Sequence, residues 1–353
     1  MYVRTGRTKA VEKIKRGLTL GKFAPLHKGH QLVIETALKE MDEVLVILYD
    51  CPKTTEIPLP MRAQWLRSLY PDVQVIEAWD GPEETGDTPE IKQKQETYVL
   101  QTLKLKGITH FYSSEFYGEH MSAALGAVNR LVDPERKVVP ISATELRADF
   151  GKGREYLDPL VYRDLVIHAV FLGAPCTGKT TLARTLAREY KTIWMPEYGR
   201  EYWEQNQIDK RLTMDQLEEI AEIHLQKEEE LLRKANRYLF TDTNALTTHH
   251  FSLYYHGSAT VKLRRRADQC AGRYDLVFVC DQDIPYEDTW DRSGEINRLV
   301  FHKQLICELI LRKIPYFLLQ GSLDNRIAKV KRILAHFKKF QNLGELFDKE
   351  ELR

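Results

Sequence analysis

The sequence predicts an α/β protein of two domains, each built on a parallel sheet flanked by helices. At 353 residues the chain is too long for one typical hydrophobic core and suits two domains. Apolar strand-like runs alternate with amphipathic helix-like segments, which is typical of parallel sheets. The alternation stops at residues 151–159, which are rich in glycine and charge and end in a proline, and then starts again. That stretch is the predicted linker.

The first domain is predicted over residues 18–155, behind a basic arm at residues 1–17. The arm carries six lysines and arginines, and we expect it to be solvated or to form a short helix. The predicted strands are 18–20, 44–49, 73–76 and 110–112; the second is a continuous apolar run typical of a buried parallel strand. A helix is predicted around Leu32, Val33, Ala37 and Leu38, which share one face, and further helices near 61–69 and 91–104.

The second domain is predicted over residues 160–353, where strand and helix patterns alternate afresh. Predicted strands are 165–172, 238–241, 274–280 and 316–319, with a further short strand after the first helix. Predicted helices are 179–190, 214–236, 295–312 and 325–340. No internal repeat or low-complexity tract is present.

Composition excludes several classes of protein. With 43% hydrophobic and 29% charged residues the chain is neither disordered nor fibrous. A net charge of +1 supplies no overall field that would attract nucleic acid or an acidic membrane. The five cysteines are scattered and form no C-x-x-C pair, so neither a disulfide framework nor a zinc site is indicated. No run approaches the roughly 20 apolar residues of a membrane span, and no signal peptide is evident, so we expect a cytoplasmic protein.

The strongest motif is a phosphate-binding loop. Residues 173–180 read GAPCTGKT and fit G-x-x-x-x-G-K-[ST] at every position, between an apolar strand and an amphipathic helix. Backbone N–H groups and the positive end of the helix surround phosphates in such loops. We expect Lys179 to reach the β- and γ-phosphates of ATP and the Thr180 hydroxyl to hold Mg²⁺. The predicted ATP-binding residues are Gly173, Ala174, Pro175, Cys176, Thr177, Gly178, Lys179, Thr180 and Thr181.

Four further residues complete the predicted kinase site. Asp242 directly follows the 238–241 strand and is either a Mg²⁺ ligand or a helix N-cap. Glu197 could accept a proton from a substrate hydroxyl, bind a ribose diol, or form a surface ion pair, and Arg200 is predicted to help bind the acceptor. Arg292 lies in a segment expected to form a mobile lid, where an arginine stabilises the transferring phosphoryl group.

A second motif, GKFAPLHKGH at residues 21–30, lies between the first strand and a helix. His27 and His30 could in principle bind a metal, but no His or Cys cluster offers a third ligand. We favour imidazole N–H donors that stabilise charge on phosphates during attack at an α-phosphorus. Residues 141–147 (ISATELR) add a helix N-cap, Ser142 or Thr144, and a cation, Arg147. Together the two motifs predict a clamp on a triphosphate.

This pair of motifs resembles the signature of the HIGH-type nucleotidyltransferase superfamily, whose members use a Rossmann-like sheet. Followed in one chain by a P-loop kinase with E-Y-G-R-E and T-D-T segments, it resembles the bacterial NadR type. These are bifunctional nicotinamide mononucleotide (NMN) adenylyltransferases and ribosylnicotinamide kinases. The resemblance covers residues 18 to about 340 and implies ATP and Mg²⁺, with nicotinamide riboside, NMN and NAD⁺ as the other small-molecule partners.

The resemblance also assigns roles to residues. In the first domain it implies ATP binding by Gly21, Lys22, Phe23, His27, His30, Ser114, Ser142, Thr144 and Arg147. In the second it implies that Lys179, Glu197, Asp242 and Arg292 are catalytic, and that Glu197, Arg200 and Asp242 bind substrate. Trp79 is a candidate to stack on nicotinamide, or else a packing residue.

The sequence departs from the family in three places. Some members begin with a helix-turn-helix domain, for which 17 residues leave no room, so we expect no DNA binding. Cys176 stands where the family has a small polar residue, and we expect it to be a bystander. The tryptophan loop reads WDGPEETG at residues 79–86 rather than P-x-G-W.

Two alternatives stay open from the sequence. A phosphopantetheine adenylyltransferase fused to a dephospho-coenzyme A kinase would have the same two ATP sites with another acceptor. A protein that senses NAD and ATP would bind without turnover and signal to a partner. A homo-oligomer is compatible with either, and the sequence does not fix the oligomeric state.

Overall fold

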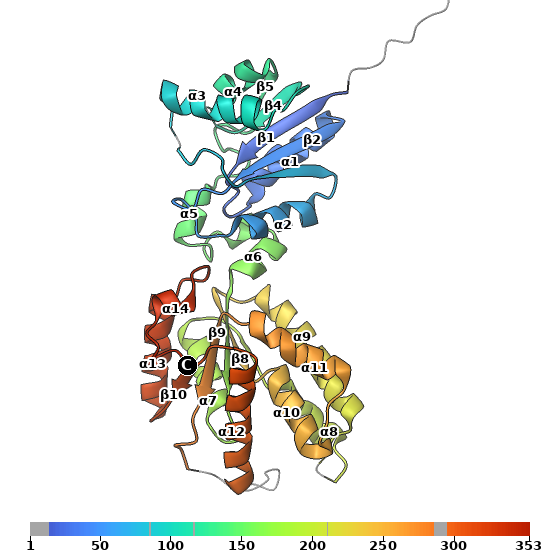
Figure 1. Ribbon diagram of the computed structural model, residues 1–353, viewed down its shortest axis with the longest axis vertical. Coiled ribbons are helices and arrows are strands. Elements are labelled where there is room, and N and C mark those ends of the chain that lie inside the picture. The colour runs from blue at the N-terminus through green and yellow to red at the C-terminus, as the bar shows by residue number, and fades with distance from the viewer. Residues whose placement is uncertain (1–13, 85, 116, 210, 286–294) are drawn as a thin grey trace, which may run out of the picture. The chain divides into compact units, whose positions relative to one another are not determined.

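The computed structural model describes residues 14–353 except 85, 116, 210 and 286–294, and it divides into two compact units between Val161 and Tyr162. Each unit is a five-stranded parallel sheet flanked by helices (Figure 1). The predicted fold class is therefore confirmed. None of the described helices has the length and apolar character that crossing a membrane requires.

Unit 1 contains a sheet with the strand order β3-β2-β1-β4-β5. Its strands are β1 (Arg16–Gly21), β2 (Glu43–Tyr49), β3 (Val73–Ala78), β4 (His110–Ser113) and β5 (Val128–Leu131). Its helices are α1 (Lys28–Glu40), α2 (Leu59–Leu69), α3 (Pro89–Thr97), α4 (Tyr117–Leu125) and α5 (Ala143–Ala148). The central strands β1 and β2 are buried over most of their length, and their apolar side chains form the core. The strand order reverses between β1 and β4, and ligands bind at the carboxyl ends of strands at such a point.

Unit 2 contains a sheet with the strand order β10-β9-β6-β8-β7. Its strands are β6 (Ile167–Leu172), β7 (Trp194–Met195), β8 (Tyr238–Asp242), β9 (Leu276–Cys280) and β10 (Phe317–Leu319). Its helices include α7 (Lys179–Glu189), α8 (Tyr198–Asn206), α9 (Met214–Leu232), α10 (Ala245–His256) and α11 (Val261–Gln269). They continue with α12 (Glu295–Leu311), α13 (Leu323–His336) and α14 (Leu343–Leu346).

The β6 strand is buried on both faces, as a central parallel strand should be. Ala169 and Phe171 belong to one apolar cluster, which includes residues of α7 and α13. Val170 and Leu172 belong to a second cluster on the other face, which includes residues of α10, α11 and α12. This rigid strand leads directly into the phosphate-binding loop.

Several element boundaries differ from the predictions. Residue 165, predicted as strand, ends helix α6 (Pro159–Leu165), so β6 begins at Ile167. The predicted linker is also partly structured, because it contains a 3-10 turn at Arg154–Tyr156 and the first residue of α6. The predicted helix 91–104 is α3 followed by a π-helical turn, Tyr98–Thr102. The β5 strand was not predicted, because all four of its residues are exposed at the sheet edge and leave no apolar run.

Candidate functional sites

The first candidate site is a pocket of about 290 Å³ in unit 1, at the reversal of strand order. The carboxyl ends of β1 and β4 form part of its wall through Thr19, Leu20 and Ser113. Every residue predicted to bind ATP in this unit lines it: Gly21, Lys22, Phe23, His27, His30, Ser114, Ser142, Thr144 and Arg147. The structure thus brings the two motifs of the first domain together around one cavity.

His27 and His30 are fixed by the start of helix α1. His27 is the N-cap, and its Nδ1 accepts a hydrogen bond from the Gly29 backbone N–H at 3.1 Å. The Nδ1 of His30 in turn accepts from the His27 N–H at 3.5 Å. Because both Nδ1 atoms are acceptors, each neutral ring carries its proton on Nε2. The Nε2–H groups therefore remain as hydrogen-bond donors.

The environment keeps both imidazoles uncharged. Burial, followed by the charges of Arg136 and Arg147, lowers the pKa of His27 to about 4. Burial and the neighbouring His27 ring, whose centroid is 3.8 Å away, lower the pKa of His30 well below its ordinary value. Neutral rings at physiological pH act as donors of fixed direction, and positive charge must come from other side chains.

Three cations line this pocket, Lys22, Arg136 and Arg147. Arg147 donates from NH1 to the Ala24 carbonyl oxygen at 2.8 Å and from NH2 to Thr144 Oγ1 at 2.9 Å, which ties α5 to the histidine loop. Arg136 was missed in the sequence, because it lies in a loop without a motif. A pocket with three cations and two neutral donors suits a polyphosphate.

Two further predictions in unit 1 have different outcomes: Ser142 is the helix N-cap, as one of the two expected candidates, whereas Trp79 does not line the pocket. The Ser142 hydroxyl donates to Glu145 Oε2 at 2.6 Å within a capping box, so its first role is to begin α5. Trp79 is 59% exposed and does not line the pocket. The same loop lines the pocket through Pro82, Glu84 and Gly86 instead.

The second candidate site begins at the phosphate-binding loop between β6 and α7. Gly173 has φ = 144°, and a Cβ there would lie 2.6 Å from the Cys280 carbonyl oxygen, so no larger residue fits. Gly178 has φ = 81° and precedes the first turn of α7. Lys179 is buried and donates from Nζ to the Ala174 carbonyl oxygen at 2.9 Å across the loop. Arriving phosphate oxygens can replace that carbonyl as its partner.

Asp242 meets the loop from the end of β8. Thr180 Oγ1 donates to Asp242 Oδ2, and the carboxylate is fully buried. Burial and the nearby charge of Glu197 raise the pKa of Asp242 to about 6, despite the opposing effect of Lys179. Its Oδ1 has no hydrogen-bond partner among the described residues. The predicted pair Thr180 and Asp242 is thus assembled, and Asn244 rather than Asp242 is the N-cap of α10.

Two buried arginines that carry no sequence motif support this loop. Arg326 of α13 donates from NH1 to the Thr177 carbonyl oxygen at 2.7 Å and forms an ion pair with Asp283. Arg298 of α12 donates from NH2 to the Ile284 carbonyl oxygen at 3.1 Å and, at 3.4 Å, to that of Cys176. Both come from helices far along the chain, so only the folded structure reveals them.

A pocket of about 360 Å³ adjoins the phosphate-binding loop within unit 2. The predicted residues Lys179, Glu197 and Arg200 line it, and Glu197 Oε2 lies 3.6 Å from Arg200 Nε. Residues that the sequence did not single out supply most of the wall, among them Trp203, His224, Thr247, Phe251, Tyr254, Tyr255 and Phe301. Arg292 lies outside the described residues.

Fold and sites together define a two-domain protein, with a nucleotidyltransferase-like unit followed by a P-loop unit. Residues 18–149 match the cytidylyltransferase-like family and residues 168–326 match an AAA domain. The trifunctional NAD biosynthesis/regulator protein NadR of Escherichia coli (strain K12) is 27% identical over 318 residues, covering 82% of this chain and 75% of that protein. The chain is therefore similar to NadR over most of its length.

Two crystal structures of NadR proteins have the same fold. One is a complex with NAD and AMP-PNP, 23% identical, with a TM-score of 0.58 over 94% of this chain and 98% of that one. The other is a complex with NR, 22% identical, with a TM-score of 0.60 over 93% of this chain and 98% of that one. The resemblance predicted from the motifs is therefore confirmed.

Proposed function

We propose that the chain is a bifunctional enzyme of NAD synthesis that uses ATP in both units. Unit 2 transfers the γ-phosphoryl group of ATP to nicotinamide riboside and forms NMN. Unit 1 transfers AMP from a second ATP to NMN and forms NAD⁺ and pyrophosphate. Similarity to NadR proteins, one in complex with NR and another with NAD and AMP-PNP, supports the substrates. The observation that carries the proposal is that each unit has its own pocket, lined by the residues predicted to bind phosphates. A cytoplasmic location belongs to the same proposal.

In unit 1 the attacking group is a phosphate oxygen of NMN, so the protein need supply no nucleophile. A P–O bond forms to the α-phosphorus of ATP, and the bond to the β-phosphate oxygen breaks, which releases pyrophosphate. The Nε2–H groups of His27 and His30 would donate to oxygens whose negative charge grows in this step. Arg147 and Lys22 would neutralise the triphosphate. Positioning and fixed donors of this kind account for most of the rate in phosphate transfer.

In unit 2 the attacking group is a ribose hydroxyl, which loses its proton as its oxygen bonds to the γ-phosphorus. The bond from the γ-phosphorus to the β-phosphate oxygen breaks, and ADP leaves. Glu197 faces the pocket and is the best-placed carboxylate to accept that proton, because Asp242 is already bonded to Thr180. Lys179 would leave the Ala174 carbonyl oxygen for the phosphates.

The residues around Asp242 fit a Mg²⁺ ion. The Asp242 Oδ1 atom is buried and has no hydrogen-bond partner among the described residues, and burial disfavours the negative charge of the carboxylate. A bound cation would give Oδ1 a partner and would offset that charge. Among the described residues no group of three His, Cys, Asp or Glu side chains could hold a metal. Mg²⁺ at phosphate sites needs only one or two protein oxygens, because phosphates and water supply the rest. Thr180 and Asp242 would hold the ion, which would supply positive charge to the phosphates of ATP.

The wall of the unit 2 pocket suits a flat cationic acceptor. Trp203, Phe251, Tyr254 and Tyr255 offer aromatic faces and edges, and Glu197 and Asp209 offer negative charge. The pyridinium ring of nicotinamide riboside is planar and positively charged, so it can stack on the aromatic rings and is attracted by the carboxylates. The dephospho-coenzyme A alternative lacks such a ring at its acceptor.

One incubation tests the proposal. The purified protein is mixed with Mg-ATP and nicotinamide riboside, and NMN, NAD⁺ and pyrophosphate are followed by chromatography. Both NMN and NAD⁺ should appear, NMN first. Absence of NMN would overturn the kinase assignment, and NMN without NAD⁺ would overturn the adenylyltransferase. In a parallel incubation with Mg-ATP and dephospho-coenzyme A, turnover would favour the alternative enzyme. Binding of ATP and NAD⁺ without turnover of either acceptor would favour a sensor.

A further inference from the structure

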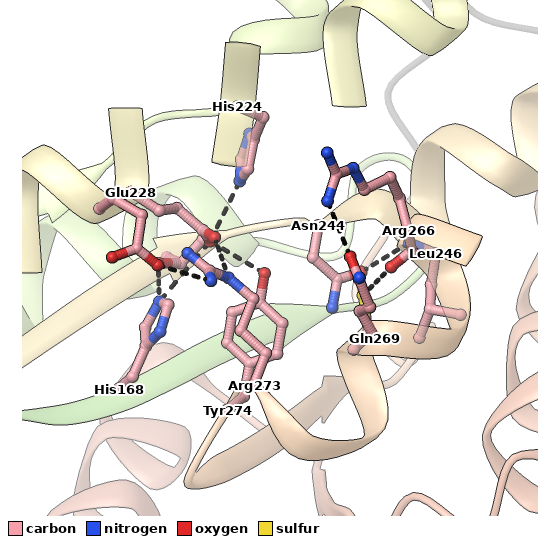
Figure 2. A network of polar contacts seen from close by, with 12 residues as sticks. His168, His224, Glu228, Asn244, Leu246, Arg266, Gln269, Arg273 and Tyr274 are labelled. Atoms are coloured by element: carbon pink, nitrogen blue, oxygen red, sulfur yellow. Dashed lines mark hydrogen bonds and ion pairs between the residues drawn. The ribbon is translucent and has the colours of Figure 1, made fainter. Parts of the chain in front are cut away.

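A buried carboxylate in unit 2 has no role in the mechanism above. Glu228 of α9 is only 1% exposed, yet four side chains approach it (Figure 2). They are His224 of the same helix, His168 of β6, and Arg273 and Tyr274 just before β9. Arg273 donates from Nε to its Oε2 at 2.7 Å, and Tyr274 donates its hydroxyl to Oε1 at 2.9 Å. The Nε2 atoms of His224 and His168 lie 3.3 and 3.6 Å from Oε1. Although burial opposes ionisation, His168 and His224 hold the pKa of Glu228 well below its ordinary value.

One member of this cluster also reaches the acceptor pocket. His224 lies one helical turn before Glu228 on α9, is 6% exposed, and lines the pocket together with Leu217 and Ile220 of the same helix. The remaining members are absent from the pocket wall. His224 is therefore the point at which the buried cluster meets the space that a substrate would occupy.

The cluster decides which ring nitrogen of His224 carries the proton. An ionised carboxylate can only accept, so the Nε2 that faces Glu228 must be protonated. Arg273 forms an ion pair with Glu228, with Nε 2.7 Å from Oε2. In the neutral ring Nδ1 is then a hydrogen-bond acceptor. Within the described part of the chain no group bonds to Nδ1, and this atom is not sealed in the interior.

We propose that His224 is a substrate-binding residue whose Nδ1 accepts a hydrogen bond from the acceptor nucleoside, and that Glu228 is the positioning residue that fixes its ring. The inference rests on the proposed kinase function of unit 2. The matching chemistry is an N–H or O–H donor of the nucleoside, which nicotinamide riboside has in its carboxamide and in its ribose hydroxyls. A group with no donor at that point would leave Nδ1 unpaired and would bind less tightly.

Three variants test the role of His224 in the kinase step with Mg-ATP. His224→Leu keeps the volume but removes both nitrogens, so the KM for nicotinamide riboside should rise about tenfold, while kcat and the KM for ATP change less than about threefold. His224→Gln can still donate to Glu228 and present an oxygen to the pocket, so it should restore most of the affinity. His249→Leu is the matched control: His249 is also a buried histidine but is absent from the pocket wall, and its KM values should be those of the wild type.

Glu228→Gln tests the positioning role without touching His224. The amide can donate to Nε2 of His224, which would move the ring proton to Nδ1 and turn the acceptor into a donor. The KM for the riboside should rise as in His224→Leu, and the double variant should be no worse than either single one. A matching rise in the KM for ATP, or fully additive effects, would indicate a general loss of structure and would overturn the positioning role.

A comparison of two substrates shows which group of the nucleoside donates the hydrogen bond to His224 Nδ1. If the carboxamide is the donor, His224→Leu should narrow the preference for nicotinamide riboside over nicotinic acid riboside, which lacks the NH₂ group. If a ribose hydroxyl is the donor, both KM values should rise equally. An unchanged KM in His224→Leu, in a preparation whose wild type turns over the riboside, overturns this inference alone. A wild type that neither binds nor phosphorylates the riboside overturns the proposed function, and this inference with it.

Discussion

Asp242 illustrates how a functional side chain is held in surroundings that do not favour its charge. Its pKa is raised from 3.8 to about 6, mainly by burial and then by Glu197. The folded protein therefore binds the Asp242 proton more tightly than the unfolded chain does. The free energy of unfolding should fall as the pH rises from about 4 to about 6, and it should stay lower above that range. The carboxylate is thus a cost to the ligand-free protein that a bound cation would offset.

Asp242→Asn should make the ligand-free protein more stable and the kinase inactive. At pH 8 the amide removes the buried charge but can still accept from Thr180, so the free energy of unfolding should rise by about 1–3 kcal/mol. At pH 4, where Asp242 is already protonated, the two proteins should differ little. Thermal unfolding at both pH values, with Mg-ATP omitted, measures this. If the variant is no more stable than the wild type at pH 8, the buried charge of Asp242 does not destabilise the ligand-free protein.

Site residues could be predicted where the residues that form a site lie close together in the sequence. The phosphate-binding loop is one short segment whose glycines and Lys179 act within a few residues of one another, and the structure places the loop at the pocket. Arg326 and Glu228 could not be found this way, since each acquires its role from partners more than 40 residues away, such as Thr177 and Arg273. His224 pairs with Glu228 one turn along α9, but only the fold brings it to the pocket. A histidine at helical spacing on α9 looks the same in the sequence whether or not it meets a pocket.

At the scale of elements, one buried arginine holds the wall of the unit 1 pocket together. Arg62 of α2 is fully buried and donates to four backbone carbonyl oxygens, those of Lys22, Tyr49, Asp50 and Ile57, at 2.6–2.9 Å. It thereby joins the turn after β1 to the loop after β2. Lys22, at one end of this connection, lines the pocket.

Arg62→Met should cost unit 1 about 3–5 kcal/mol of stability, because it leaves several buried carbonyl groups without donors. NMN adenylyl transfer should be lost at lower temperature than in the wild type, while kinase activity should keep its own heat-inactivation profile. Arg67→Met on the same helix is the control, since Arg67 is exposed and, among the described residues, forms an ion pair with Glu77 alone. Equal heat stability of adenylyl transfer in the two variants would show that Arg62 does not hold this wall.

The strands that were predicted from the sequence are those whose burial produces a run of apolar residues. The strands β2 and β6 are apolar except for Glu43 and His168 because helices cover both faces of their sheets, and each was predicted to within two residues. The exposed edge strand β5 has no such pattern. Residue 165, the last residue of α6, was predicted as strand because it precedes β6 in one mostly apolar stretch, 165–172, in which periodicity cannot separate helix from strand.

At the scale of the whole molecule, each unit has its own sheet, core and pocket, and no residue that lines the unit 1 pocket also lines the unit 2 pocket. The two reactions should therefore be separable by single substitutions. The product of the kinase, NMN, is the substrate of the adenylyltransferase, so the two sites need only share a diffusing intermediate.

Lys179→Ala and His30→Ala test this separation. Lys179→Ala removes the cation of the phosphate-binding loop and should lower kinase turnover at least about 10³-fold, while adenylyl transfer to added NMN stays within about twofold of the wild type. His30→Ala removes one fixed donor and should lower adenylyl transfer about 10²–10³-fold, with NMN accumulating from the riboside. Mixed in one tube with Mg-ATP and nicotinamide riboside, the two variants should again produce NAD⁺, because NMN released by one can enter the other. If either folded variant lost both activities, the units would not work independently. The same would follow if the mixture made no NAD⁺ although each variant alone retained its expected activity.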